Sequence, residues 1–365
     1  MANFDPNAMI RGAQLTVVGA VRALHNPGLF KYEHYRQAAI AVVAGIAIRL
    51  AISAPIVMIK IALWALSFVM DFEAATWDDK LVSSLDFVQN KVLQVPFFLM
   101  SLMRYITPTL DNLFMDSLNW VDATYMQKHK GDNPDKLRAM YHANLRLYSA
   151  HGDTSKQRKP TDAAMKFIVR FGRRAGISLA IYMLSYLPVV GRFVLPAASF
   201  YTFNQAAGPI PATVVFGGGI FLPRRYLVIF LQSYFSSRSL MRELLEPYFS
   251  RVRFTREQKQ RWFRDREGLL FGFGVGFYIF LKTPLLGVLI YGIAEASTAY
   301  LITKITDPPP PPAYRDGFAE SQTRWENKVE FLRLPLTNLD AHNVSTDETE
   351  QNPLSSGNTG TKKIQ

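Results

Sequence analysis

The chain has 365 residues, is 49% apolar and 13% aromatic, and carries a formal net charge of +12 at pH 7. It has no cysteine, which excludes disulfide bonds and thiolate metal sites. Its apolar residues are gathered into blocks of about 20 residues or more, which is long enough for helices that cross a bilayer. The blocks cover residues 38–70, 92–114, 177–203, 210–231 and 268–302. This pattern predicts an all-α membrane protein, and the alternative is a large soluble core.

The N-terminal segment, residues 1–36, is predicted to hold an amphipathic helix that ends at Asn26 and Pro27. Its apolar residues recur at helical spacing and form one stripe: Ile10, Ala13, Val17, Val21 and Leu24. Arg11 and Arg22 lie off that stripe. Two interpretations remain open. The helix either lies in the plane of a membrane surface or packs against a membrane-embedded bundle.

Charge differs between the segments that connect the apolar blocks. The connector at 71–91 has five acidic residues and two lysines, whereas the loops at 122–174 and 233–267 are basic. Lys and Arg concentrate on the cytosolic side of membrane proteins, so the basic loops and both termini are predicted to be cytosolic. The chain then forms three helical hairpins, at 38–114, 177–231 and 268–302. The first is predicted to be a long spanning pair, and the other two either span or are re-entrant.

The same pattern divides the chain into a cytosolic segment at 1–36, a multi-pass membrane domain at 37–306 and a tail at 307–365. In the first basic loop, Asn133 predicts the start of a helix that runs to Tyr148. The tail opens with the prolines at 308–312, which predict a stiff polyproline spacer. A short amphipathic helix is predicted around Trp325, and the residues from Asn338 onward have the composition of a disordered tail.

Residues that carry catalysis, cofactor binding or metal binding are not found at the spacings these functions need. The six histidines lack the spacing of metal ligands, and no GxSxG nucleophile motif is present. The stretch GFGVGF, with Gly272, Gly274 and Gly276, lacks the spacing of a dinucleotide fingerprint. Glycines in an apolar helix more often permit close contact with another helix. The sequence therefore predicts a non-enzymatic protein without a cofactor or a metal ion.

Charged residues within or beside the apolar blocks are the candidate functional residues. Arg49, Lys60 and Arg104 are the candidates for an anion path. Arg49 and Lys60 share one face of a helix at a separation of about 16 Å, because three helical turns lie between them. An ionisable group inside a bilayer costs about 2.5 to 3.5 kcal/mol on insertion scales, so these groups need partners or water. The alternative is that they reach the membrane surfaces or form structural pairs, such as Glu295 with Arg104 or Lys282.

A basic run, YFSRVRFTREQKQRWFRDR at 248–266, mixes arginine with tyrosine and tryptophan. A nucleic-acid partner is not favoured, because the run directly precedes an apolar block, where basic and aromatic residues meet anionic headgroups. The predicted partner is therefore a lipid bilayer with anionic headgroups. A second copy of the chain and a small anion are further candidates.

The stretch at 249–301 resembles the C-terminal signature of CysZ-type sulfate permeases and the related etoposide-induced membrane proteins. The shared features are an arginine-rich helix, a Phe271–Gly272 step, a Pro-Leu-Leu turn at 284–286 and an alanine-rich final arm. A closer similarity is to fungal membrane proteins of the UsgS and outer spore wall (Lds/Rrt) type. It rests on HYRQAAIAV, VPFFLMSLMRYITPTLD and VLPAASFYTFNQAAGP, at residues 34–42, 95–111 and 194–209.

The resemblance to the CysZ group implies two long spanning helices and two half-penetrating hairpins. The Lds/Rrt group is associated with the endoplasmic reticulum, lipid droplets and the spore wall. We therefore expect a non-enzymatic multi-pass membrane protein of the endoplasmic reticulum or lipid droplets that supports lipid or spore-wall processes. The alternative that the resemblance leaves open is an anion permease for a sulfate-like anion.

Overall fold

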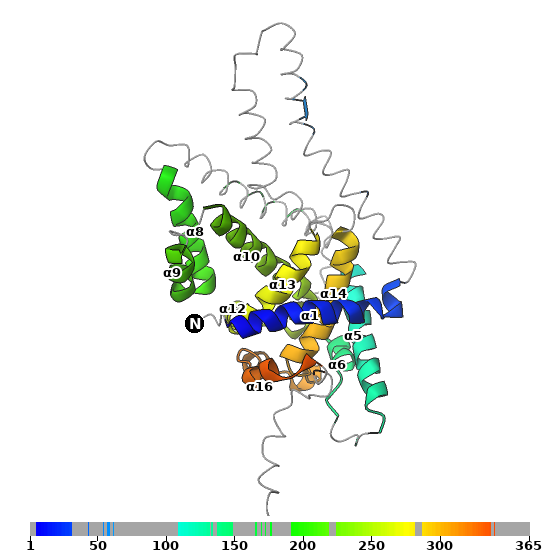
Figure 1. The fold of residues 1–365 in the computed structure, drawn as a ribbon. Coiled ribbons are helices and arrows are strands. Elements are labelled where there is room, and N and C mark those ends of the chain that lie inside the picture. Colours follow the sequence, from blue (N-terminus) through cyan, green and yellow to red (C-terminus); the bar gives the residue numbers. More distant parts are fainter. Residues whose placement is uncertain are drawn as a thin grey trace, which may run out of the picture.

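The computed structural model describes residues 5–30, 109–131, 137–148, 191–218, 224–281 and 287–336, together with a few isolated positions. Every regular element in these ranges is a helix (Figure 1), which confirms the all-α prediction for the described residues. Within the same ranges, none of the helices combines the length and the apolarity needed to cross a bilayer. Nearly all of the predicted first hairpin, at 38–114, lies outside the described residues.

The N-terminal helix forms close to where the sequence predicts it. Helix α1 (Pro6–Leu24) begins with Asp5, whose side chain accepts a hydrogen bond of 2.9 Å from the backbone N–H of Asn7. Pro6 at the first helical position fits because its missing N–H would be unpaired there in any case. A short 3-10 helix, η1 (Pro27–Phe30), follows directly.

Two long helices form the centre of the bundle and occupy the third predicted hairpin: α13 (Glu267–Leu281) and α14 (Gly287–Ile305). Helix α13 packs against α1 and α10 (Arg224–Leu244), and α14 packs between α1 and α5 (Thr109–Lys128). The core between them is built from fully buried side chains, among them Leu15, Phe114, Leu118, Leu240 and Phe273. The hairpin is thus the part of the fold on which α1, α5 and α10 pack (Figure 1).

Two helices of the second predicted hairpin, at 177–231, meet at Gly208. Helix α8 (Gly191–Ala207) ends at Gly208, and α9 (Pro209–Gly218) begins immediately after it. Gly208 has a φ of 98°, a backbone conformation that glycine adopts without the steric cost other residues meet. Phe203 and Ala207 of α8 pack with Ala212 of α9 and with α10 in a second apolar cluster.

A shorter helix in the first basic loop begins later than predicted. Helix α6 (Tyr141–Leu147) starts at Tyr141, whereas the sequence places the start near Asn133. Its start coincides with a contact from another helix, because a carboxylate oxygen of Asp122 on α5 accepts a 2.7 Å hydrogen bond from the backbone N–H of His142. A cap supplied by a distant segment cannot be read from local sequence.

Two further helices, rich in charged residues, follow α10 along the chain. They are α11 (Glu246–Val252) and α12 (Arg256–Asp265). Thr255 and Gln258 form a capping box at the start of α12, in which each side chain pairs with the backbone N–H of the other residue. The turn before α12 passes through Arg253, which has a φ of 60°.

The proline-rich segment differs from the predicted spacer, because it lies against α6. Asn144 donates a 2.8 Å hydrogen bond to the carbonyl of Pro309, and the Tyr148 hydroxyl donates a 2.6 Å hydrogen bond to that of Pro310. Three short helices follow, η4 (Pro312–Tyr314), α15 (Phe318–Ser321) and α16 (Lys328–Arg333). Residues 307–336 are therefore part of the bundle. The predicted amphipathic helix around Trp325 is instead two short helices, with Trp325 between them.

Candidate functional site

Helices α1 and α13 cross at a point where a glycine of each helix lies against the backbone of the other helix. A Cβ atom at Gly12 would fall on the carbonyl oxygen of Leu269, and one at Gly272 would fall on the carbonyl oxygen of Met9. Thr16, one turn after Gly12, donates a hydrogen bond of 3.1 Å to the carbonyl of Phe273. The two backbones are thus in direct contact, and the prediction that the GFGVGF glycines permit close helix packing is confirmed.

The apolar stripe of α1 faces away from this contact. Four of its members have large exposed fractions: Ile10 59%, Val17 64%, Val21 49% and Leu24 46%. Ala13 is exposed as well, whereas Arg11 is 7% exposed and its guanidinium donates to the carbonyls of Leu332 and Leu334. The helix therefore packs on the bundle through its small residues and presents an apolar face outward. This arrangement reverses the usual placement of polar and apolar residues on a surface helix.

Apolar side chains are also exposed at one end of the bundle. In Figure 1 the start of α10, the end of α13 and the start of α14 all point toward the same side, at the top of the view. These helix ends expose Ile229, Ile279, Phe280 and Leu289, each by 45% or more. At the opposite end, α12 exposes residues that are almost all polar or charged: Arg256, Glu257, Gln260, Arg261 and Arg264. The described bundle thus has an apolar end and a charged end.

A buried charge network joins α10 to α13 near the charged end. The Tyr234 hydroxyl donates a 2.8 Å hydrogen bond to Glu267 and accepts one of 2.8 Å from Arg238. Arg238 also lies 3.5 Å from the second carboxylate oxygen of Glu267, and both side chains are nearly fully buried. Burial raises the pKa of Glu267, and the positive charge of Arg238 and the Tyr234 hydrogen bond oppose that effect. The carboxylate is held in the interior by these two partners.

A second buried pair fixes α11 against the start of α5. Arg251 donates two hydrogen bonds, of 2.8 and 2.6 Å, to the two carboxylate oxygens of Asp111. It also donates a 2.8 Å hydrogen bond to the carbonyl of Pro247. A bidentate pair of this kind fixes the relative orientation of the two helices more firmly than a single contact.

Lys304 lies two residues beyond the last apolar block, 268–302, and is almost completely buried at the end of α14. Its ammonium group donates a 2.6 Å hydrogen bond to the carbonyl of Leu339. Loss of hydration lowers the pKa of Lys304 to about 7, and the positive charges of Arg138, Arg22 and Lys128 act in the same direction. The charged form is therefore less favourable in the folded protein than in the unfolded chain.

We expect this lysine to make the free energy of unfolding rise with pH. Above about pH 7 Lys304 releases its proton in the folded chain but still binds it in the unfolded chain, where its pKa has the ordinary value of 10.5. Stability should therefore increase from neutral pH towards about pH 10, and replacing Lys304 by methionine should stabilise the protein by about 1 to 2 kcal/mol near pH 6.5. Thermal or denaturant unfolding at several pH values measures the difference.

The matched control is Lys259→Met on α12, a more exposed lysine that pairs with Glu246 at 2.7 Å. We expect this variant to change stability by less than about 1 kcal/mol, because an exposed pair contributes little. A gain for Lys304→Met that stays the same at every pH would show that titration of this lysine is not its cause.

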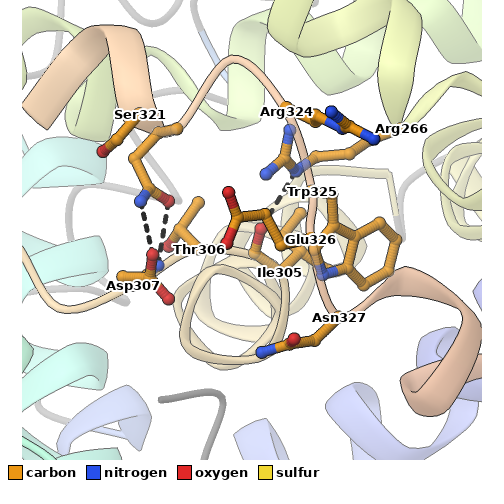
Figure 2. A pocket seen from close by; sticks show the side chains of 10 residues that line it. Arg266, Ile305, Thr306, Asp307, Ser321, Arg324, Trp325, Glu326 and Asn327 are labelled. Atoms are coloured by element: carbon orange, nitrogen blue, oxygen red, sulfur yellow. Dashed lines mark hydrogen bonds between the residues drawn. The ribbon is translucent and has the colours of Figure 1, made fainter. Parts of the chain in front are cut away.

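A small cavity lies beside the end of α14, between that helix and the C-terminal segment (Figure 2). Its volume is about 190 Å³, and Arg266, Asp307, Arg324, Trp325 and Glu326 are among the residues that line it. Arg266 is 1% exposed and its Nε donates a 2.9 Å hydrogen bond to the carbonyl of Ile305. The guanidinium lies over the rings of Trp262 and Trp325, at 4.6 and 5.6 Å from their centroids.

The basic run at 248–266 is therefore only partly a surface that could meet headgroups. Arg251 and Arg266 are buried, together with the aromatic residues Tyr248, Trp262 and Phe263. The sequence contains one signal for this arrangement, because Trp262 and Arg266 are four residues apart and can stack on one face of a helix. The exposed arginines of the run face outward from α12 and the turn before it.

The candidate anion path cannot be placed, because Arg49, Lys60 and Arg104 lie outside the described residues. The same holds for Lys282, one of the two cations considered as a partner for Glu295. Glu295 itself is 0% exposed, in the interior of α14. Within the described ranges, no cluster of His, Asp or Glu side chains has the arrangement of a metal site.

Comparison with known proteins gives no relative: no family model, no curated protein and no solved structure matches the chain. Function is therefore inferred from the geometry of the described helices and from the residue patterns of the sequence.

Proposed function

We propose that the protein is a non-enzymatic multi-pass membrane protein of the endoplasmic reticulum or lipid droplets, which supports lipid or spore-wall processes. In this proposal α1 lies at the membrane surface and the apolar end of the α13–α14 hairpin enters the lipid. The observation that carries the proposal is the outward face of α1. From Ile10 to Leu24 every exposed position of that helix is apolar.

Water is an unfavourable environment for this face. Each large apolar side chain that moves from water into an apolar environment gains about 1.5 to 3 kcal/mol when burial is complete. The four long members of the stripe are about half exposed, so their transfer into the interfacial region of a bilayer contributes several kcal/mol by the same scale, roughly 3 to 6 in total. A contiguous apolar face of this kind on a folded chain marks an interaction surface.

The position of the crossing supports a shallow insertion of the hairpin. Leu281, at the end of α13, lies nine positions after Gly272, where α1 crosses, which is about 14 Å of helix. Helix α14 extends a similar distance, about 15 Å, from Ser297 beside Gly19 to Gly287. If α1 marks the membrane surface, these arms reach about half of a hydrocarbon core that is roughly 30 Å thick. The third hairpin would then be re-entrant, one of the two arrangements that the sequence leaves open.

A half-penetrating hairpin fits a bilayer and also the phospholipid monolayer of a droplet. The first hairpin, which the sequence predicts to span and which has an acidic connector at 71–91, fits a bilayer only, since carboxylates in droplet oil would be very costly. A fluorescent fusion imaged against a neutral-lipid dye distinguishes the two compartments.

The test uses single cysteines, because the native chain has none. We expect a fluorophore on Val17→Cys to be quenched by lipids that carry a spin label near the headgroup, and one on Phe280→Cys to be quenched best by deeper labels. The control is Leu147→Cys on α6, which is 63% exposed but lies at the charged end. We expect at least about twofold less quenching there, because an exposed apolar residue alone need not meet lipid. Equal quenching of positions 17 and 147 would refute membrane contact through α1.

A further inference from the structure

A groove lies between α1 and α16, at the start of the apolar stripe of α1. Its volume is about 470 Å³, which is within the range of roughly 300 to 1,000 Å³ that is usual for ligand pockets. One wall includes Ile10 and Gln14 of α1, and the other includes Val329 and Arg333 of α16. Each pair is four residues apart and therefore lies on one face of its helix. The groove thus adds a concave site to the otherwise convex surface of α1.

Arg11 joins the two walls of this groove. Its side chain is 7% exposed, and its guanidinium donates a 2.9 Å hydrogen bond to the carbonyl of Leu332 and a second one to the carbonyl of Leu334. These carbonyls lie at the C-terminal end of α16, where a helix has unpaired acceptors and attracts a cation. The charge of Arg11 is therefore used within the protein, and α16 is held beside α1 before a ligand binds.

Apolar lining residues continue the outward face of α1 into the groove. Ile10 belongs to both surfaces and is 59% exposed, and Val329 on the opposite wall is 62% exposed. Figure 1 shows α16 beside the first half of α1, on the side away from the apolar end of the bundle. With α1 at the membrane surface, as proposed above, the groove opens at the level of the lipid headgroups.

Two charged side chains of opposite sign remain for a ligand in the groove, Asp5 and Arg333. One carboxylate oxygen of Asp5 accepts the capping hydrogen bond from the backbone N–H of Asn7, which leaves the other outside this cap. Arg333 is exposed beside the carbonyls that Arg11 binds, and six residues of helix, about 9 Å, lie between Arg11 and Asp5. The negative and positive groups are thus separated along the groove, with apolar side chains between them.

We propose that this groove binds the headgroup of one zwitterionic phospholipid, with the phosphodiester at Arg333 and the ammonium group at Asp5. The proposal rests on the membrane contact of α1. Arginine can donate two parallel N–H groups to the oxygens of one phosphate, which makes this pair strong and directional. The glycerol and the upper acyl chains would lie along Ile10 and Val329. A headgroup that lacks the ammonium would leave the charge of Asp5 facing a phosphate, which is unfavourable.

The experiment is native mass spectrometry of the full chain, released from maltoside micelles after titration with phosphatidylcholine. We expect one saturable phosphatidylcholine per chain, and about tenfold weaker binding of a diacylglycerol with the same acyl chains, because it has no phosphate to accept from Arg333. Arg333→Gln should weaken phosphatidylcholine binding to a similar extent, about tenfold. The matched control is Arg256→Gln on α12, an exposed arginine outside the groove, which should change the affinity by less than about twofold.

Asp5→Asn tests the ammonium contact by itself. Asparagine caps a helix as well as aspartate does, so this change removes the charge and keeps the start of α1. Phosphatidylglycerol has the phosphodiester but no ammonium, and we expect the native protein to bind it about fivefold more weakly than phosphatidylcholine, the effect of one exposed charge contact. Asp5→Asn should remove most of this difference.

Three results would overturn the proposal. Unchanged affinity in Arg333→Gln would place the lipid elsewhere, and equal binding of phosphatidylcholine and phosphatidylglycerol to the native protein would exclude selection of a zwitterion. Inorganic phosphate that displaces the lipid at equal concentration would show that the groove takes a free anion. The membrane contact is tested separately by the fluorophore on Val17→Cys. Quenching there without saturable lipid binding would refute the groove alone, whereas absence of quenching would refute the membrane contact on which it rests.

Discussion

Replacing Gly272 by alanine is expected to lower the free energy of unfolding by about 3 kcal/mol, the upper part of the range for overpacked sites. The added Cβ would fall on the carbonyl oxygen of Met9, and a backbone atom cannot move aside as a side chain can. Helix α1 would have to separate from α13, which also exposes Leu15 and Thr16. Denaturant unfolding measures the loss, and faster proteolysis of the first 24 residues would show that α1 has left the bundle.

The matched control is Gly292→Ala on α14, where a Cβ would lie 3.6 Å from a methyl carbon of Leu113, an ordinary contact. There we expect a gain of about 0.5 to 1 kcal/mol, because alanine is the better helix former. Gly12→Ala should cost as much as Gly272→Ala, and the double variant should cost much less than the sum, since both changes disrupt one crossing. A Gly272→Ala protein as stable as the Gly292→Ala protein would show that the close contact is wrong.

The sequence predicts α1 well, because the residues that define this helix lie within it or directly before it. The stripe from Ile10 to Leu24 has the spacing of one helix face. Asp5 caps the start of the helix, and Pro6 occupies its first position. The direction in which the stripe faces depends on residues far away in the chain. It depends on Gly12 and Gly19 opposing α13 and α14, so the buried side is formed mainly by small residues and Leu15, and the apolar stripe is left outside. The usual assumption that the apolar stripe packs inward fails for this helix.

The glycines of α13 show the same limit. GFGVGF predicts a close approach, and the structure shows it. Gly272 lies against α1, Gly276 lies against Thr16, and a Cβ added at Gly274 would be 2.9 Å from the carbonyl oxygen of Ser237 on α10. Nothing in the stretch itself indicates that the partners lie more than 250 residues earlier or about 35 residues earlier in the chain. A small residue marks that a neighbour comes close but carries no information about which neighbour it is.

The buried arginines are the part of the candidate site that the sequence analysis missed. In the run at 248–266, arginine beside an apolar block is typical of a headgroup-facing surface. Arg251 is instead paired with Asp111, about 140 residues earlier, and Arg266 is held by the carbonyl of Ile305 and by two tryptophans. Trp262 is the one local partner, whereas Asp111, Ile305 and Trp325 are distant in the chain. The burial of these cations therefore depends mainly on tertiary contacts that local charge patterning does not contain.

For the polyproline segment, composition predicts the local conformation but does not predict that the segment packs against α6. Prolines favour an extended backbone without internal hydrogen bonds, which leaves their carbonyls free to accept from elsewhere. Asn144 and Tyr148, four residues apart on α6 and its C-cap, donate to this segment, and Tyr141, three residues before Asn144, donates to the carbonyl of Thr306 just before it. The spacing of these donors in the sequence was a usable signal, because it places them on one face of a helix.

The second large effect is expected at the buried network of α10 and α13. Glu267→Ala should cost about 3 to 5 kcal/mol, because it leaves the charge of Arg238 buried without its carboxylate. Tyr234→Phe should cost less, about 1 to 3 kcal/mol, since it removes one donor to Glu267 and one acceptor from Arg238 but keeps both charges paired. Replacing Glu267 and Arg238 together by methionine removes both charges, and we expect stability to return to within about 1 kcal/mol of the native protein.

The control for this series is the exposed pair Arg261–Glu320, at 3.4 Å, whose side chains are 62% and 56% exposed. Removing Glu320 should cost less than about 1 kcal/mol, because solvent screens both charges. A double-mutant cycle on each pair, read by denaturant unfolding, isolates the coupling energy from unrelated losses. We expect several kcal/mol of coupling at the buried pair and close to none at the exposed one. Equal coupling at both pairs would contradict the burial of Glu267, and with it the packing of α10 on α13.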